Sequence, residues 1–401
     1  MHNQRRNRPP HNPARLNSDP NRIRNIEVNK NFNTDVCIVG GGIVGLSTAY
    51  FLSLNKISVI VLDPDSIGSH ASGFAFGGLS PLGEAGQVDE IISELSVARL
   101  GMSIHTEFAK ILPELTGIDI QHRFRPALDL AFSDEEAKEA KDQVKWRASE
   151  DGYSVEWLEA KEVLDMVPEI SNEINGAVFT KGVADVEPYR LMLALTTACE
   201  KMGVNIISTK ARGLGFDGHT ATSVISDRGD IHCNSVVLAM GPWSLNASKW
   251  INQKIPIRPL KGQIIRLKSD KVNLQMSVGW QGNYACTKPD GLLWAGTTEE
   301  DVGFDDSPSS FGRDSVLASL TKMINGLESA QLIHHTACLR PLSNDGKIIL
   351  GEVPDTSNLY IASGTGRKGI LLGPGMGKIT SDIITGSSHN YDLTPFNLSR
   401  F

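Results

Sequence analysis

Three glycines near the N-terminus have the spacing of a loop that binds a dinucleotide. Gly40, Gly42 and Gly45 satisfy the pattern G-x-G-x-x-G between a predicted strand and a predicted helix. The first glycine of this pattern allows a tight turn, the second lets the backbone approach a pyrophosphate, and the third lets the helix pack on the strand. The start of the helix then offers free N–H groups and a partial positive charge to the phosphates.

An acidic residue follows at the position where such a loop binds a ribose. Asp63 lies 23 residues after Gly40, at the end of a second predicted strand. A carboxylate there accepts hydrogen bonds from both ribose hydroxyls and would repel a 2′-phosphate, which disfavours NADP. The glycine pattern alone is weak, but with the strand, the helix and Asp63 it predicts a dinucleotide site. FAD and NAD both remain open at this point.

Two further glycine-rich stretches favour FAD over NAD. Residues 67–83 are rich in Gly, Ser and Ala, and the ribityl chain and ring of a flavin need additional close contact with backbone. Gly364, Gly366 and Gly369 form a second G-x-G-x-x-G, but no acidic strand end follows about 20 residues later, as a second nucleotide domain would require. We interpret this stretch as a second loop that touches the same cofactor.

The elements that must position these residues predict an α/β fold. Strand, glycine turn, helix and strand within residues 35–63 form a Rossmann-type βαβ unit. Buried strands of the same kind recur at 235–241 and 359–364, so one domain is built from discontinuous pieces. The material between them predicts helices at about 87–115, from 134 and at 189–202, strands at 126–132 and 203–208, a β-rich region at 256–298, and a final loop and helix at 369–386.

Composition and charge narrow the class of protein. The chain has 401 residues, which predicts two domains, and its net charge of −7 gives no indication of a nucleic-acid partner. No apolar run approaches the roughly 20 residues that span a bilayer. Five scattered cysteines without a CxxC pair favour a reducing cytoplasm. His334 and His335 have no partner at metal-ligand spacing, so we expect no metal site.

The first residues form a basic leader. Residues 1–30 carry seven Lys or Arg against two Asp or Glu, and Arg5-Arg6 lacks the apolar stretch that an export signal requires. We therefore expect residues 1–33 to be a disordered, solvated extension. A weak tether to an acidic partner or a membrane surface is the alternative.

Several motifs occur in the order typical of the D-amino-acid oxidase superfamily, and the chain resembles its glycine oxidase and sarcosine oxidase branch. They are DVCIVGGGIVGLSTAYFL, ASGFAFGGLSP, GVADVEPYRL, SVVLAMGPWS, RPLKGQ, LWAGTTEE, CLRPLSNDGKIILG and GTGRKGILLGPGMG. The resemblance extends from about residue 34 to 390. The blocks LRPxxxDGKxxxG and GxxRxGILLxP are its most specific parts.

The resemblance implies a Rossmann-type FAD-binding domain and a discontinuous substrate domain, whose antiparallel sheet covers the re face of the flavin. We expect the FAD domain at 34–90, 180–250 and 335–401, and the substrate domain at 91–179 and 251–334. The expected FAD contacts are Gly40, Gly42, Ile43, Val44, Gly45, Asp63, Pro64, Ala71, Ser72, Phe76, Gly77, Gly78, Gly241, Thr365, Gly366, Arg367, Lys368, Gly369, Ile370 and Leu371, with a backbone contact to adenine near Arg212.

The resemblance also assigns three residues to the substrate. Arg340 matches the arginine that grips the substrate carboxylate, Tyr284 a tyrosine that helps this grip, and Arg367 a further arginine of the pocket. The assignment agrees with physical chemistry, since a buried carboxylate must be paired and a guanidinium pairs with it through two hydrogen bonds. A structural ion pair is the alternative for either arginine, and a core position is the alternative for the tyrosine.

The activity that the resemblance implies is oxidation of the C–N bond of a small amino acid or N-alkyl amino acid. Hydride transfer from Cα–H to flavin N5 gives an imine, which water hydrolyses to an oxo acid and an amine or ammonia. Oxygen or another electron acceptor then reoxidises the flavin. The alternatives are a D-amino-acid or opine dehydrogenase subunit with a carrier other than oxygen, a flavin-binding assembly module without turnover, and an NAD-dependent dehydrogenase. A homo-oligomer is compatible with the sequence.

Three positions depart from the family pattern. Arg125 and Pro126 stand where this branch commonly has glycine, and we hypothesise that Arg125 lines the pocket and favours a larger or more anionic amine. A surface or packing role is the alternative. Thr365 stands where relatives often have histidine, so the tuning of the flavin could differ.

His70 resembles a histidine that bears covalent FAD in some relatives, but the tryptophan before it is absent, and we expect FAD to be bound without a covalent link.

Overall fold

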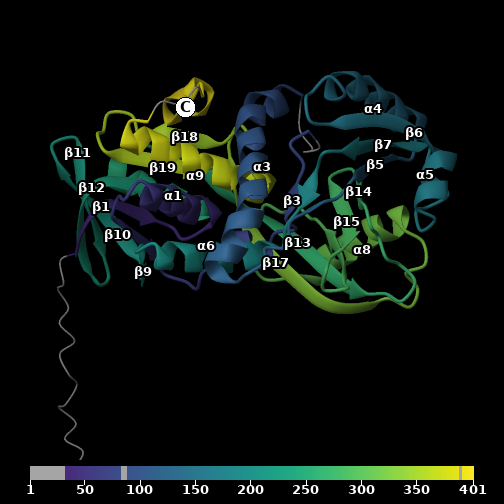
Figure 1. Cartoon of the computed structure of the whole chain (residues 1–401), viewed down its shortest axis with the longest axis horizontal. Coiled ribbons are helices and arrows are strands. Elements are labelled where there is room, and N and C mark those ends of the chain that lie inside the picture. The colour runs from purple at the N-terminus through teal and green to yellow at the C-terminus, as the bar shows by residue number, and fades with distance from the viewer. Residues whose placement is uncertain (1–31, 83–87, 388–390) are drawn as a thin grey trace, which may run out of the picture.

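The computed structural model describes residues 32–82, 88–387 and 391–401. Figure 1 shows an elongated molecule, with one sheet and its helices towards one end and a second sheet with its own helices towards the other. The expected leader lies outside the described residues, except that Phe32 and Asn33 already belong to the first strand. Among the helices of the described residues, none is long and apolar enough to cross a membrane.

The first sheet contains eight strands around a parallel centre. Strands β1 (Phe32–Val39), β2 (Val59–Asp63), β9 (Asn205–Ser208), β12 (Gly229–Leu238) and β19 (Leu359–Ser363) pair in parallel, while β10 (Ala211–Asp217), β11 (Thr220–Ser226) and β18 (Ile349–Glu352) add antiparallel pairs. The central strands are continuous apolar runs because both of their faces are buried. Val36 and Ile38 face one core, and Cys37 and Val39 face the other.

Helices cover this sheet and meet each other through glycines. They are α1 (Ile43–Leu54), α2 (Ala71–Phe74), α3 (Val88–Thr116), α6 (Pro188–Lys201), α7 (Ser248–Ile251) and α9 (Gly369–Thr385), with short 3-10 helices at Gly241–Ala247, Gly366–Lys368, Thr394–Phe396 and Leu398–Arg400. A Cβ on Gly377 of α9 would lie 2.6 Å from Cβ of Ser47 in α1, and one on Gly101 of α3 would lie 2.0 Å from the carbonyl oxygen of Leu371. Only glycine permits such close packing of these helices.

The second sheet also has eight strands, in the order β17-β13-β16-β15-β14-β5-β7-β6. These are β5 (Ala127–Ala131), β6 (Ser154–Glu159), β7 (Gly176–Lys181), β13 (Ile257–Lys268), β14 (Ser277–Trp280), β15 (Asn283–Thr287), β16 (Leu293–Gly296) and β17 (Gln331–Ser343). All neighbours are antiparallel except β14 and β5. The resemblance implied such an antiparallel sheet, so the expected fold class is confirmed.

Three helices pack on the two faces of this second sheet. Side chains from α5 (Ala160–Met166) and α8 (Ser310–Met323) share a core with Leu128 and Leu130 of β5, whereas α4 (Asp134–Arg147) packs with Val178 of β7 on the opposite face. Ser133 caps α4 by accepting a hydrogen bond from the amide of Glu136. The α4 face of the sheet is the one that faces the candidate site.

Several of the expected domain boundaries fall within single helices or strands. The expected boundaries at 91, 180 and 335 fall inside α3, β7 and β17. Apolar residues of α3, such as Val97 and Phe108, belong to the same core as α1. We therefore propose that the first domain includes α3, and that the second sheet includes the whole of β17. Apolar periodicity located these elements, but it does not specify which core each one joins.

A small sheet with a buried ionic cluster joins the two halves. It pairs β8 (Ala184–Asp185) with β3 (Gly78–Leu79) and β4 (Arg123–Phe124). The Asp185 carboxylate lies 2.7 Å from Nε of Arg123, 3.0 Å from Nε of Arg125 and 3.1 Å from Nζ of Lys288. Burial alone would raise the pKa of Asp185, but these three cations together hold it below its ordinary value. One carboxylate therefore pairs with three cations, and two of these, Arg125 and Lys288, are buried.

We expect Asp185→Asn to destabilise the protein by about 3–5 kcal/mol, because the variant leaves buried cations without their counter-charge. The stabilisation is present above the ordinary aspartate pKa of about 4 and is lost as the pH falls through the lowered pKa. The stability of the variant should therefore fall less on acidification below this pH. Urea denaturation at several pH values measures both effects. Asp314→Asn, which removes an exposed ion pair, should change little, and an equal loss in both variants would contradict the assignment.

Candidate functional site

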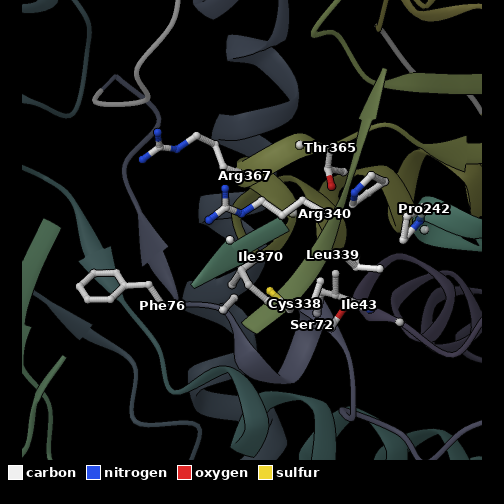
Figure 2. Close-up of a pocket in the computed structure, with 18 of the residues that line it drawn as sticks. Ile43, Ser72, Phe76, Pro242, Cys338, Leu339, Arg340, Thr365, Arg367 and Ile370 are labelled. Atoms are coloured by element: carbon white, nitrogen blue, oxygen red, sulfur yellow. Dashed lines mark hydrogen bonds between the residues drawn. The ribbon is translucent and has the colours of Figure 1, made fainter. Parts of the chain in front are cut away.

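A cavity of about 1170 Å³ runs between the two sheets. Its wall on the side of the first sheet comes from the glycine turn after β1, the end of β2, the loop around α2 and the start of α9. Its other wall comes from strands β5, β13, β14, β15 and β17 of the second sheet and from helix α4, which packs on that sheet. Figure 2 shows part of this cavity, with Ile43 and Ser72 below Arg340 and Arg367 in the view.

The glycine turn is closed to any side chain. Gly40 has φ +110° and its amide donates to the carbonyl of Leu62 over 2.8 Å. A Cβ on Gly40 would lie 2.2 Å from the carbonyl oxygen of Ala239, and one on Gly45 would lie 1.9 Å from that of Gly40. Both contacts are far shorter than real Cβ atoms allow. The turn therefore excludes a side chain at both positions, as the glycine pattern predicted.

Two side chains hold this turn from outside. Oδ2 of Asp63 accepts a hydrogen bond from the amide of Gly41 over 2.7 Å, and Oγ of Ser72 accepts one from the amide of Ile43 over 3.1 Å. Burial raises the pKa of Asp63, and hydrogen bonds from the amides of Asp65 and Gly41 offset this only in part. The Asp63 carboxylate thus lies at the cavity, anchored to the turn that it follows in the sequence.

Arg340 enters the cavity from β17. The residue is 7% exposed, its Nη1 donates to the carbonyl oxygen of Thr298 over 3.2 Å, and its Nη2 donates to Oγ1 of Thr297. The guanidinium passes directly over Gly262 of β13, where a Cβ would lie 2.0 Å from Nη2. The glycine of the RPLKGQ motif is therefore needed to let this arginine reach the cavity.

Arg367 and Tyr284 lie beside Arg340. Nη2 of Arg367 donates to the carbonyl oxygen of Gly282 over 2.7 Å, and both guanidinium groups lie near Oε1 of Glu299, at 3.5 Å for Arg367 and 3.7 Å for Arg340. Burial raises the pKa of Tyr284, although the charges of the two arginines act against this rise. Figure 2 shows the two guanidinium groups projecting in the same direction. The three residues that the resemblance assigned to a carboxylate are thus brought together at one place.

Most of the expected cofactor residues line the cavity. They are Gly40, Gly42, Ile43, Val44, Asp63, Pro64, Ala71, Ser72, Phe76, Gly77, Gly78, Arg212, Gly241, Thr365, Gly366, Arg367, Gly369 and Ile370. Gly45, Lys368 and Leu371 are not among the lining residues. Gly45 packs α1 on the turn, Lys368 pairs with Glu94, and Leu371 is buried in the first core.

Arg212 lines the cavity, and its charge is paired with another residue. Its guanidinium is exposed and pairs with Asp227 over 2.7 Å, while the neighbouring Lys210 and Ala211 also line the cavity. This arrangement is compatible with the expected backbone contact near Arg212. His70 also lines the cavity, with Nε2 2.9 Å from Oδ2 of Asp65 and its ring 4.7 Å from that of Trp243.

The hypothesis that Arg125 lines the pocket is wrong. Its side chain is 4% exposed, pairs with Asp185, and donates to the carbonyl oxygens of Leu274 over 2.9 Å and Thr287 over 2.8 Å. It is not among the residues that line the cavity. Arg125 therefore has the packing role that was the alternative, because the buried Asp185 and two carbonyl groups satisfy it.

Sequence reasoning also missed several residues of the cavity. Trp243 stands in the SVVLAMGPWS motif, two residues after Gly241, so the motif offered a signal for it. No local pattern indicated Asp129 of β5 or Arg147 of α4. Both line the cavity because α4 packs on the sheet face that β5 shares with Tyr284.

Comparisons with known proteins agree with this geometry. The family model for FAD-dependent oxidoreductases of the DAO type matches residues 35–383. Glycine oxidase of Bacillus subtilis is 28% identical over 368 residues, which cover 91% of this chain and 97% of that protein. Glycine oxidase of Pseudomonas putida is 28% identical over 363 residues, covering 90% of this chain and 97% of the relative.

Solved structures extend the similarity to the whole architecture. The crystal structure of glycine oxidase from Geobacillus kaustophilus superposes with a TM-score of 0.87 at 27% identity, covering 92% of this chain and 99% of that one. The turn formed by Gly40 and Gly45, the carboxylate of Asp63 and the size of the cavity fit a dinucleotide cofactor. The chain belongs to the DAO family of FAD-dependent oxidoreductases and is an enzyme similar to the glycine oxidases.

Proposed function

We propose that the protein oxidises the C–N bond of a small amino acid or N-alkyl amino acid. The observation that carries this proposal is the convergence of Arg340, Arg367 and Tyr284 in the same cavity as the dinucleotide turn. Two guanidinium groups and a phenol suit a carboxylate, and a flavin-binding module without turnover would have no need of them. Membership of the family supports the same reading.

FAD would be held mainly by the first domain. The turn around Gly42 would receive the pyrophosphate, Asp63 the ribose of the adenosine, and the backbone from Thr365 to Ile370 the flavin end. Oγ of Ser72 already holds the amide of Ile43 and so fixes the start of α1. When bound, FAD supplies the chemistry by accepting a hydride and its electron pair from the substrate. We propose that it is bound without a covalent link.

Arg340 would pair with the substrate carboxylate through two hydrogen bonds. A guanidinium has five N–H donors, and the protein uses one N–H of Nη1 for Thr298 and one N–H of Nη2 for Thr297. Glu299, at 3.7 Å, is farther than the roughly 2.8 Å of a charge-assisted hydrogen bond. Tyr284 and Arg367 would complete the grip. Together they would fix the Cα–H bond, which is the contribution a protein makes to hydride transfer.

The rest of the reaction needs little from side chains. Loss of the hydride from Cα and of a proton from the amine nitrogen gives an imine, and water then converts it to an oxo acid and ammonia or an amine. Tyr284 is beside Phe76, with ring centroids 4.1 Å apart, so an apolar surface adjoins the carboxylate grip. Such a surface excludes water from the Cα–H bond before transfer.

We expect a member of an amine panel to bleach the flavin of the purified protein under anaerobic conditions. The panel is glycine, sarcosine, D-alanine, D-proline, dimethylglycine and an opine, and absorbance of the flavin band is the measurement. Recovery of colour with peroxide on admitting air would identify oxygen as acceptor. Recovery only with an added carrier would support the dehydrogenase alternative. A yellow protein that no member bleaches would contradict the proposed function.

Arg340→Ala should lower kcat/KM for the bleaching amine by about 30-fold or more, since removing one partner of a buried charge pair costs about 2–5 kcal/mol. The measurement is steady-state kinetics at equal flavin content. Arg258→Ala is the matched control, because Arg258 lies on β13 in an exposed pair with Asp301. An unchanged kcat/KM in Arg340→Ala would rule out the carboxylate grip.

Asp63→Asn should weaken FAD binding by about tenfold or more, because a hydrogen bond to a charged group contributes about 1.5–3 kcal/mol. The measurement is the FAD content of the purified protein, read in the supernatant after acid precipitation. The same step tests the link, since flavin that is not covalently bound should all appear in the supernatant. Asp217→Asn, in the hairpin at the edge of the same sheet, should retain normal content. Yellow precipitate would point to a covalent link through His70.

A further inference from the structure

The cavity continues beyond the carboxylate grip to a charged end that neither the family motifs nor the proposed reaction uses. This end, here called the acidic end, is formed by Asp129 of β5 and by Glu136, Glu139, Gln143 and Arg147 of α4. It contains three carboxylates against one guanidinium. Oxidation of an amine as small as glycine would not require charged groups at this distance from the arginines.

The register of the second sheet connects the acidic end to the grip. Tyr284 pairs with Gly279, and Gly279 pairs with Asp129, so the three positions form a row across β15, β14 and β5. Paired residues point to the same face of a sheet, and neighbouring strands lie about 4.8 Å apart. The backbone positions of Tyr284 and Asp129 are therefore about 10 Å apart on one wall of the cavity.

Gly279 leaves the wall open between these two side chains. A Cβ on Gly279 would lie 3.0 Å from Oδ1 of Asp129, which is a tight contact, and the glycine itself fills none of this space. Gly279, Tyr284 and Asp129 all line the cavity. A ligand held by its carboxylate at Tyr284 and Arg340 could thus extend along the wall to the carboxylate of Asp129.

Asp129, unlike Glu136, is a carboxylate of this end that has capacity for a ligand. Nη1 of Arg147 lies 3.7 Å from Oδ2 of Asp129, farther than a charge-assisted hydrogen bond of about 2.8 Å, and its Nη2 donates to Gln143 instead. Burial raises the pKa of Asp129, and the charge of Arg147 offsets this only in part. A cationic group beside Asp129 would supply the interaction that its carboxylate lacks.

Glu136, by contrast, is already satisfied within the protein. Its carboxylate accepts hydrogen bonds from the amide of Phe132 over 2.6 Å, from Nε1 of Trp280 over 3.1 Å and from Nε2 of Gln281 over 2.7 Å. Its negative charge still adds to that of Asp129 and Glu139, and among the described residues that line this end Arg147 is the one cation that opposes them. A second anionic group on the substrate would meet net repulsion here, whereas a cation would be attracted.

We propose that Asp129 binds a distal ammonium or guanidinium group of the substrate, so that the preferred substrate is a basic amino acid or an N-alkyl derivative of one. The inference rests on the proposed function for the position of the carboxylate. In this proposal Asp129 determines substrate specificity. The substrate chain passes over Gly279, which has no side chain to block its path.

Binding of two matched carboxylates to the FAD-loaded full chain tests this inference. The probes are 6-aminohexanoate and hexanoate, which differ by the distal ammonium and carry no α-amine, so neither is consumed. Isothermal titration calorimetry should give a Kd at least tenfold lower for 6-aminohexanoate. Asp129→Asn should reduce this preference to about threefold or less. Asp142→Asn, an exposed acid on the same helix α4, should retain it.

A second variant keeps the test valid if Asp129→Asn disturbs Arg147 or the fold. Gly279→Ala places a methyl group in the opening and should also abolish the preference for 6-aminohexanoate. Equal binding of the two probes by the unmodified protein, binding of neither, or a preference unchanged in both variants would overturn the inference. Failure of the proposed function is a separate result, since it is read from the amine panel and not from these dissociation constants.

Discussion

The cavity depends on glycines in both of its walls, at positions where a side chain would meet a neighbouring group. Gly40 and Gly45 fold the cofactor turn so tightly that a side chain on either would overlap a carbonyl oxygen. On the other wall, Gly262 leaves the path that the Arg340 guanidinium takes, and Gly279 leaves the stretch between Tyr284 and Asp129 open. The same constraint therefore admits the cofactor, the arginine that would grip the substrate, and the substrate chain itself.

Buried cations near this cavity are either fully paired within the protein or paired only in part. Around Asp185, the protein supplies ion pairs and carbonyl acceptors to the nearby cations, and Arg125 is consequently closed to any ligand. At the cavity, Arg340 receives partial compensation from Thr297, Thr298 and a distant Glu299. A buried guanidinium is costly unless it is paired, so incomplete pairing inside the protein favours an anionic ligand there.

The sequence could predict the parts of the site that depend on neighbouring residues, but not those that depend on contacts between distant elements. The turn at Gly40 and the ribose position of Asp63 follow from spacing within one βαβ unit, where neighbours in sequence are neighbours in space. Arg125 and Arg147 could not be distinguished in this way, because which of them reaches the cavity depends on the partners that distant strands and helices bring. Asp185, far from Arg125 in the sequence, pairs with Arg125 and holds it away from the cavity. The packing of α4 on the second sheet places Arg147 in the wall of the cavity.

Sheet register, rather than any motif, sets the length of the substrate that this cavity would favour. In the proposed grip, Tyr284 lies on β15 and Arg340 on β17, whereas Asp129 of the acidic end lies on β5, so the strands between them set their separation. A change of substrate within such a fold needs no new catalytic group. It requires a different side chain in the row that contains Tyr284, Gly279 and Asp129, at positions that leave the cofactor turn untouched. Specificity can therefore vary independently of flavin chemistry in this architecture.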